Sequence, residues 1–368
     1  MQKNLTMELS SEQLDTLREL VGTPTPTGSE HAGMMVLGRR LKATTGLQPT
    51  IDVHGNLHCV LDRGAKRTVM IEGHCDEIGF LVQYIDDDGF VYLSALGGVT
   101  VPLCAAERIV IAGRKGPVNG VIGMRPPHLM NAQERKQVAK DELRQMPCDI
   151  GASSRKEAEE LVSVGDAAVV DTGWRPLAGT RVSCRGFDNR VGTFAMCEAF
   201  AKIATSACGT GCNVHYVASV QEEVGLVGGR TAAYDVAPAI GVCCDVAFAT
   251  DAQKDDRKVS GDVRLGRGVA VGIGPTYHRG LTDHFRAIAD SQRIPYQNRA
   301  IARGSGTNAW AMRLERGGAA VAQLSIPLRY MHSPVEVIDL ADVAAVIELV
   351  AKGVGALDDG FPLLPEQP

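Results

Sequence analysis

The 368-residue sequence lacks several features that would place it in a specialised class of protein. It contains no apolar run long enough to span a bilayer, so we expect no membrane segment. Its net charge of -5 provides no basic surface, and we therefore expect no nucleic-acid partner. The first residues, Met1 to Thr6, contain no apolar signal core, so we do not expect export.

The cysteines lack the spacing of a structural metal site, because none of the ten forms a Cys-x-x-Cys pair. Most of them lie inside apolar segments, such as Cys197 within Phe194 to Phe200. Cysteines in this context are small buried hydrophobic side chains of a reduced protein, and we expect a cytoplasmic one. Nucleotide-binding signatures are also absent, since Gly272-Ile273-Gly274-Pro275 lacks a third glycine and no Walker loop occurs.

The length and the 45% hydrophobic content allow a large core and about two domains. Ser10-x-x-Gln13 is a capping box that predicts a first helix, and strands are predicted at 57–61 and 68–72. Helices that alternate with strands indicate an α/β layer fold.

Residues 78–125 show a different pattern, of short strands joined by tight turns, and helical signals return at 131–144 and 154–162. From Cys184 the α/β pattern resumes. We therefore predict a catalytic domain made of residues 1–77 and 181–368, with a β-rich insert at 78–180.

Acidic and histidine side chains stand next to predicted strand ends and glycines at five places. Ligands of an open parallel sheet bind outside the carboxyl ends of its strands, so these side chains are expected to meet at one rim. Two imidazoles and several carboxylates suit Zn, Co or Mn. Three carboxylate ligands would repel one another without cations, which favours two divalent ions. The five places are His74, Asp188, the pair Glu222-Glu223, Asp245 and His332.

Each of these residues also has an ordinary structural explanation. His74 can be a structural histidine, Asp188 can cap a helix that starts near Val191, and Asp245 can form a turn. His332 can belong to a surface loop, and the two glutamates can be solvated surface acids. The joint pattern is more specific than any one member, and it favours the metal site.

Four segments resemble the signature segments of the M42 family of metallo-aminopeptidases, which includes glutamyl aminopeptidases and tetrahedral, TET-type peptidases. The likeness covers nearly the whole chain in the right order. It implies an α/β/α sandwich of the zinc-peptidase type with a mixed sheet, and an inserted β-barrel domain that serves dimerisation and assembly. The segments are His74-x-Asp76-Glu77-Ile78-Gly79, Phe187-Asp188-Asn189-Arg190, Val220-Gln221-Glu222-Glu223-Val224-Gly225 and Arg329-Tyr330-Met331-His332-Ser333-Pro334.

The resemblance also implies metal ligands and a quaternary state. His74 and Asp245 would hold one divalent ion, Glu223 and His332 would hold the other, and Asp188 would bridge the two. The substrates would be short peptides, and the chain would form a homo-oligomer of dimers, up to a dodecamer.

Two further acids receive catalytic roles from the same resemblance. Asp76 would orient the imidazole of His74, and Glu222, left free of metal, would be the general base and acid. A metal-bridging water would supply hydroxide, and Glu222 would move its proton to the leaving amine. A free N-terminal amine would bind at the other metal or at nearby acids, which restricts cleavage to the first residue.

The sequence also allows other functions. A deacylase or amidase of small N-acyl compounds would share the metal chemistry without needing a free amine. A glycan hydrolase would need two carboxylates free of metal, and a metal-binding scaffold would need no free proton carrier.

One segment departs from the family pattern. Where members often carry Gly-Gly-Thr-Asp-Ala, this chain has Gly306-Thr307-Asn308-Ala309 followed by Trp310. Asn308 removes a negative charge expected near the substrate pocket, and Trp310 adds bulk. The preferred N-terminal residue therefore does not follow from the resemblance.

Overall fold

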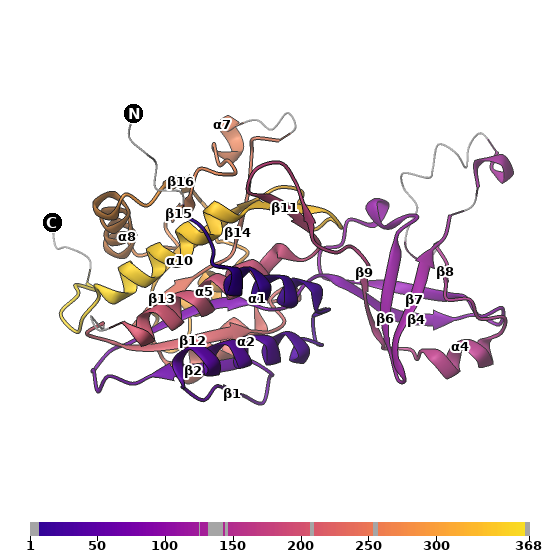
Figure 1. Ribbon diagram of the computed structural model, residues 1–368, viewed down its shortest axis with the longest axis horizontal. Helices are drawn as coiled ribbons and strands as arrows, with labels where there is room; N and C mark the ends of the chain where they lie inside the picture. Colours follow the sequence, from indigo (N-terminus) through magenta and orange to yellow (C-terminus); the bar gives the residue numbers. More distant parts are fainter. Residues whose placement is uncertain are drawn as a thin grey trace.

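The computed structural model describes residues 7–124, 126–131, 143, 146–206, 210–252 and 257–364. An α/β body and a smaller β barrel lie next to each other (Figure 1). Most of the helical signal predicted at 131–144 falls outside the described residues. No helix within the described ranges is long and apolar enough to cross a membrane.

The body is built on a mixed sheet, to which the described part of the chain contributes nine strands. The strand order is β1-β2-β12-β3-β13-β17-β15-β16, and β14 pairs with β17. Strands β12, β3, β13 and β17 run parallel to one another, so their carboxyl ends lie along one edge of the sheet. The bounds are β1 Thr50–Ile51, β2 Leu57–Leu61, β3 Thr68–His74, β12 Asn213–Ser219, β13 Ile240–Cys243, β14 Val246–Phe248, β15 Val269–Ile273, β16 Tyr296–Ala300 and β17 Ala320–Leu328.

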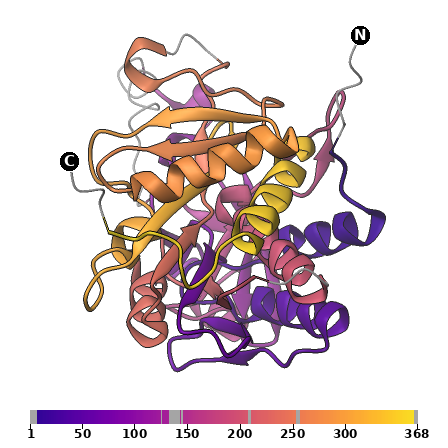
Figure 2. The same cartoon turned by 90° about the vertical axis from the view of Figure 1, so that its left-hand side faces the viewer.

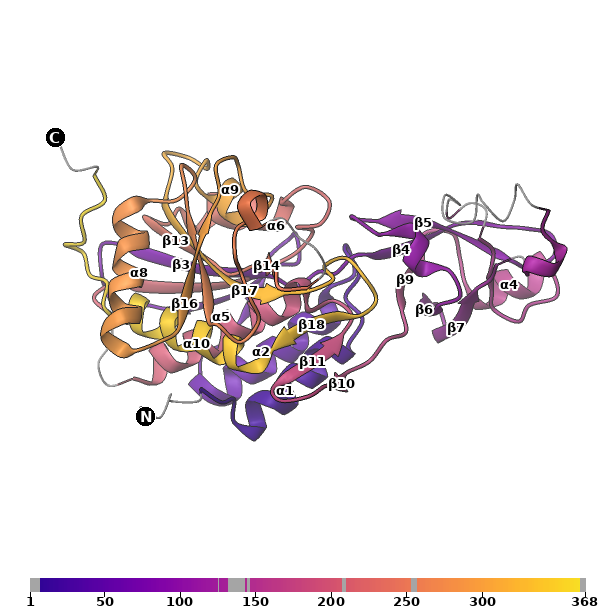
Figure 3. The same ribbon diagram turned by 90° about the horizontal axis from the view of Figure 1, so that it is seen from above.

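Helices cover both faces of this sheet, as the view from above shows (Figure 3). One face carries α1 (Ser11–Gly22), α2 (His31–Thr45), α5 (Phe187–Thr205), α8 (Arg279–Gln292) and α10 (Leu340–Gly355). The other face carries α6 (Val227–Val236) and α9 (Asn308–Met312), while α7 spans Arg257–Ser260. The orange α8 and the yellow α10 lie side by side in Figure 2. The predicted α/β/α sandwich with a mixed sheet is confirmed.

The predicted capping box begins the first helix. The Ser10 side chain accepts from the Gln13 backbone at 3.2 Å, and the Gln13 side chain accepts from the Ser10 backbone at 2.9 Å. Two of the backbone N–H groups that a helix start leaves without partners are thereby satisfied.

The barrel closes through six described strands in the order β4-β5-β8-β7-β6-β9. It has a hydrophobic core of its own, which includes Phe80, Val82 and Ile111. The bounds are β4 Gly79–Ile85, β5 Val91–Leu96, η1 Val101–Cys104, β6 Arg108–Gly113, β7 Gly116–Ile122, η2 Pro127–Leu129, β8 Cys148–Asp149, α4 Arg155–Leu161 and β9 Ala167–Val170.

The chain returns from the barrel through a small sheet in which β10 (Arg175–Pro176) pairs with β11 (Arg181–Cys184), and β11 pairs with β18 (Glu336–Asp339). Strand β10 thus lies inside the range predicted for the insert but pairs with β11, which lies outside that range. The domain limits at 77/78 and 180/181 stay a prediction.

Candidate metal centre

The edge formed by the carboxyl ends of the parallel strands carries most of the predicted site residues. His74 is the last residue of β3, and Glu222 and Glu223 follow β12. Asp245 follows β13, and His332 lies four residues after β17. Because these strands are neighbours in the sheet, five side chains that are distant in sequence meet at one rim.

Left-handed backbone at two positions turns the chain at this rim. Gln221 has a φ of 54° and His332 a φ of 60°, a conformation that residues other than glycine adopt rarely. The turn at Gln221 ends the two-residue alternation of β12. Glu222 and Glu223 can therefore both face the site instead of pointing to opposite faces of the sheet.

Asp188 lies between the two histidines. It belongs to the first turn of α5, but its own backbone is extended, with φ -74° and ψ 109°. Its Oδ1 is 3.6 Å from Nε2 of His74, and its Oδ2 is 3.3 Å from Nε2 of His332. Each carboxylate oxygen thus faces a different imidazole, which is the arrangement a bridging carboxylate requires.

The remaining acids surround these imidazoles. Nε2 of His332 is 3.5 Å from Glu223, and Nε2 of His74 is 3.8 Å from both Glu222 and Asp245. Among the described residues, two sets of three donors lie within 4.8 Å of one another and could hold a metal ion. Distance alone does not separate the roles of Glu222 and Glu223. The two sets are His74, Asp188, Glu223 and His74, Glu222, Asp245.

Both imidazoles are oriented through their other ring nitrogen. Nδ1 of His74 lies 3.2 Å from the carbonyl oxygen and 3.3 Å from the carboxylate of Asp76. Nδ1 of His332 lies 3.0 Å from the carbonyl oxygen of Gly98, in the segment after β5 of the barrel. An N–H at Nδ1 donates to these oxygens and leaves the Nε2 lone pair free toward the carboxylates, as a metal ligand needs.

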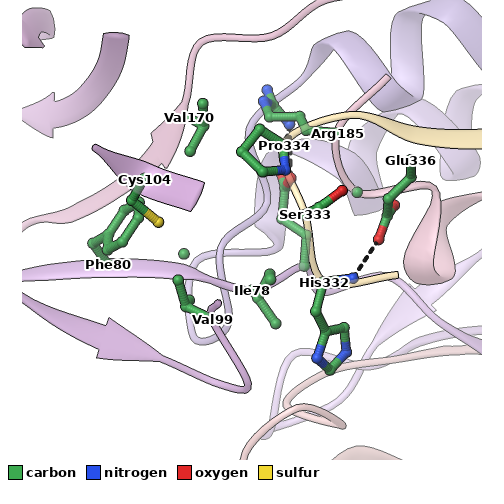
Figure 4. Close-up of a pocket in the computed structure, with 13 residues that line it drawn as sticks. Ile78, Phe80, Val99, Cys104, Val170, Arg185, His332, Ser333, Pro334 and Glu336 are labelled. Atoms are coloured by element: carbon green, nitrogen blue, oxygen red, sulfur yellow. Dashed lines mark hydrogen bonds and ion pairs between the residues drawn. The ribbon is translucent and has the colours of Figure 1, made fainter. Parts of the chain in front are cut away.

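Two buried carboxylates fix the backbone of this site. Asp76 accepts hydrogen bonds from the amides of Glu222 and Glu223 at 3.0 and 3.1 Å. Glu336 accepts from the amides of Asp188 at 3.1 Å and of His332 at 3.0 Å, the second of which is drawn in Figure 4.

Sequence reasoning missed Glu336 and Gly98. The only signal for Glu336 was an acid at the start of a short strand, and the glycine pair at 97–98 predicted no more than a strand break. Neither signal indicates contact with a residue at the rim.

The site concentrates negative charge. Burial, together with the neighbouring carboxylates of Asp245 and Asp188, raises the pKa of Glu222 and of Glu223 to about 9. Burial alone would lower the pKa of His74, but the charge of Glu222 and bonds to other carboxylates raise it well above its usual value. Four acids around two imidazoles are stabilised by cations, and this nitrogen and oxygen donor set fits divalent ions such as Zn, Co or Mn.

A model of the M42 glutamyl aminopeptidase family matches residues 55–349. The chain belongs to this family. It is 33% identical to the lysyl aminopeptidase of Pyrococcus furiosus, over 91% of this chain and 94% of the relative. This M42 chain is therefore a peptide hydrolase of a metal-dependent family, and the predicted family is confirmed.

Solved structures agree with this membership. An aminopeptidase from the archaeon Desulfurococcus kamchatkensis has a TM-score of 0.85 at 34% identity and covers 94% of both chains. The TET1 peptidase of Pyrococcus horikoshii, described as assembling into a tetrahedron or a large octahedral shell, has a TM-score of 0.82 at 29% identity, over 94% of this chain and 99% of that chain.

Asn308 is buried beneath the rim. Its side chain is 1% exposed, and its Nδ2 donates to Glu72 at 2.7 Å and to Ser219 at 3.0 Å. The reason is that α9 packs against one face of the sheet, which directs Asn308 into the core beneath the rim. Asn308 thus pairs with the buried Glu72, and its effect on the choice of substrate stays a prediction.

Two cavities of different size border the rim. One lies between the barrel and the body beside His332, lined by Ile78, Phe80 and Val99 on one side and Pro334 on the other (Figure 4). Its volume of about 30 Å³ fits a group the size of one water molecule. The other has a volume of about 420 Å³ and is lined in part by Tyr330 and Met331, the residues before His332. Only the second of these two is large enough for an amino-acid side chain.

Proposed function

We propose that this M42 chain is a dinuclear metal-dependent aminopeptidase that removes the N-terminal residue from short peptides. The observation that carries this proposal is the meeting of two imidazoles and four carboxylates at the carboxyl edge of one sheet, around a central Asp188. A mixed nitrogen and oxygen donor set in this position is typical of sites that bind two divalent ions.

The ligands follow the family pattern. His74 and Asp245 would hold one ion, Glu223 and His332 the other, with Asp188 shared between them. When bound, Zn, Co or Mn ions supply Lewis acidity and lower the pKa of water. The short contacts of Asp188 to both imidazoles support its shared position.

Glu222 would move the proton. Its carboxylate stands beside the predicted ligands, and its backbone is held by Asp76, so a proton can be transferred at a fixed position. Glu222 would accept a proton from the attacking water and donate it to the leaving amine. A carboxylate bound to metal is a poor proton carrier, which is why the neighbouring Glu223 receives the other role.

A panel of substrates and metals tests the proposal. The metal-free protein should not hydrolyse aminoacyl-coumarin amides, and added Zn, Co or Mn should restore hydrolysis with two ions bound per chain. The same amides with an acetylated amine should be refused, because a blocked terminus cannot bind as a free amine does. Efficient cleavage of the acetylated compounds would favour the deacylase, and cleavage by the verified metal-free protein would contradict metal-dependent hydrolysis.

Hydrolysis of glycans, or metal binding without turnover, would instead match the two remaining alternatives. Neither the glycan hydrolase nor the metal-binding scaffold uses Glu222 as the proposed proton carrier to a leaving amine. We propose the aminopeptidase because the chain belongs to a family of peptide hydrolases.

We also propose that the chain forms a homo-oligomer through its barrel, from dimers up to a dodecamer. The assembly described for the P. horikoshii TET1 peptidase supports this proposal. Light scattering of the purified chain gives the mass, and a monomer at micromolar concentration would contradict it. A cytoplasmic location remains a prediction, and the described cysteines are buried and unpaired, as reduced cysteines are.

The family does not decide which first residue is preferred. The family description names glutamyl aminopeptidase, whereas the P. furiosus relative is named a lysyl aminopeptidase. Glutamyl and lysyl side chains carry opposite charges. The selection must depend on side chains that this chain places beside its rim.

A further inference from the structure

Four consecutive backbone amides after β12 donate to side-chain oxygens that come from other parts of the chain. They belong to the segment 220–223, which carries the predicted proton carrier. Val220 donates to Oδ1 of Asn56 at 3.0 Å, Gln221 to Oε1 of Glu30 at 3.1 Å, and Glu222 and Glu223 to the two carboxylate oxygens of Asp76 at 3.0 and 3.1 Å.

The three accepting side chains are buried and distant in sequence from this segment. Asn56 and Asp76 are 0% exposed, and Glu30 is 5% exposed. Glu30 directly precedes α2, Asn56 directly precedes β2, and Asp76 follows β3. A buried N–H group is stable only with a hydrogen-bond partner, so these side chains determine where the backbone of the segment can lie.

Gln221 is the member of this segment that most needs support. Its φ of 54° is a conformation that residues other than glycine keep only where their surroundings hold it. Glu30 accepts from its N–H, and its carbonyl accepts from the amide of Val227 at 3.2 Å. The peptide groups on both sides of Gln221 are thus fixed, and the next residue is Glu222. Any relaxation of this turn would move the Glu222 carboxylate.

The loop before α2 holds Glu30 in place and contacts the segment by two routes. Oε1 of Glu30 also accepts from the amide of Gly28 at 2.7 Å. The hydroxyl of Thr27 donates to Asp76 at 2.9 Å. Glu30 lies outside both sets of described residues that could hold a metal ion. Its contacts are therefore those of a residue that supports the site without belonging to it.

We infer, on the basis of the proposed function, that Glu30 is a positioning residue that places Glu222 for proton transfer. Its oxygen holds the left-handed turn at Gln221, and this turn directs the Glu222 carboxylate into the site. Proton transfer depends on the distance between donor and acceptor, and a displacement of about 1 Å can lower a rate about 100-fold. Glu30 thus acts on turnover through Glu222 and needs no contact with substrate or metal.

Glu30→Ala is the first test. With aminoacyl-coumarin amides and saturating metal, kcat should fall about 10- to 100-fold, while KM should stay within about twofold of the wild type. Elemental analysis should still find two ions per chain. Loss of an ion would mean that Glu30 acts through the predicted ligand Glu223, and it would overturn the inference.

Two conservative variants separate the reach of the side chain from its charge. Glu30→Gln keeps an oxygen at the same distance from the backbone, and this oxygen can accept from both Gln221 and Gly28. Its kcat should stay within about threefold of the wild type. Glu30→Asp keeps the charge but is one methylene shorter, so it should lose most of the kcat that Glu30→Ala loses. The opposite order of these two variants would overturn the inference, and it remains decisive if Glu30→Ala does not fold.

A double variant tests whether Glu30 acts through Glu222. When Glu222→Gln has already removed the proton carrier, the addition of Glu30→Ala should lower the residual kcat by less than about twofold. A general structural defect would instead lower kcat by the same factor in the wild-type and the Glu222→Gln backgrounds. That result would contradict the positioning role.

Glu19→Ala is the matched control for the lost charge. Glu19 lies on α1, is 56% exposed and pairs with an exposed arginine, so its removal should leave kcat at the wild-type value. An equal fall in Glu19→Ala and Glu30→Ala would overturn the inference. A wild-type kcat in Glu30→Ala would also overturn it and leave the aminopeptidase standing. No hydrolysis by the metal-loaded wild type would overturn both proposals.

Discussion

The carboxylate of Asp76 accepts a hydrogen bond from the backbone amide of Glu222 at 3.0 Å. It also accepts from the amide of Glu223 and stands 3.3 Å from Nδ1 of His74. One fully buried side chain therefore connects the end of β3 with the segment after β12. Its position fixes an imidazole and two glutamates relative to one another, although it faces away from the Nε2 of His74.

Asp76→Asn should weaken metal binding more than it weakens folding. The asparagine side chain has the shape of the carboxylate, but its NH₂ group cannot accept from a backbone N–H, so either the Glu222 or the Glu223 amide loses its bond. Metal affinity should fall about 10- to 100-fold, and kcat should fall with it even at saturating metal. Calorimetric metal titration and steady-state kinetics measure the two effects. Thr27→Val, which removes the hydroxyl that donates to Asp76 and to the carbonyl of Glu77, should give the smaller change.

Glu222→Gln should separate proton transfer from metal binding. The amide keeps the size of the side chain but cannot accept the proton, so kcat should fall about 10²- to 10⁴-fold. Metal content, measured by elemental analysis, should stay at two ions per chain. Loss of an ion in this variant would make Glu222 a ligand, in line with its 3.8 Å distance from His74, and would contradict the division of roles with Glu223.

Gly98→Ala, a substitution in the segment after β5 of the barrel, should disturb the metal site at His332. A Cβ at Gly98 would lie 2.6 Å from Nδ1 of His332, closer than such atoms approach, so the imidazole or the loop must shift. The metal held by His332 should bind at least about 10-fold more weakly, the range seen when a partner of a ligating histidine is lost. Metal stoichiometry at limiting concentration measures this. Gly173→Ala, where nothing lies within 4 Å, is the control and should bind as the wild type does.

The sequence was sufficient for features that depend on local pattern or on strand order. Strand 57–61 and the capping box at Ser10 were predicted with their observed positions. The rim was predictable because polar residues beside glycine marked the ends of strands, and the carboxyl ends of parallel strands meet at one edge.

Contacts across long sequence separations could not be predicted. Gly98 and His332 are 234 positions apart, and their contact depends on how the barrel is docked on the body. The packing of α9 directs Asn308 to Glu72, 236 positions away, and no sequence pattern indicated that pair.

Asn308→Asp should destabilise the fold beneath the rim. Glu72 is 0% exposed and accepts from Asn308, so the substitution would place two carboxylates together in the core. The free energy of unfolding should fall by about 3 kcal/mol, the upper range for an unpaired buried polar group. Chemical denaturation measures this change.

The double variant Glu72→Gln with Asn308→Asp should recover part of that loss. Its glutamine amide can donate to the new carboxylate, which restores a donor and an acceptor. If the double variant is less stable than the sum of the two single changes, Glu72 and Asn308 are not paired in the way the distances indicate.

His215 should make the protein sensitive to mild acid. Burial and the neighbouring His58 lower the pKa of His215 to about 4, and its Nε2 lies 3.0 Å from Nδ1 of His58. Well above pH 6.5 the residue is neutral in both states and has no effect on stability. Between pH 6.5 and 4 the unfolded chain binds a proton that the folded chain does not, so stability falls as pH falls, by up to about 3 kcal/mol.

His215→Asn keeps a donor for His58 but cannot titrate. Urea denaturation at pH 7, 6, 5 and 4.5 should therefore show a shallower loss of stability for this variant than for the wild type. The same substitution at the exposed His31 should leave the wild-type slope, and an equal slope for all three proteins would show that His215 does not contribute.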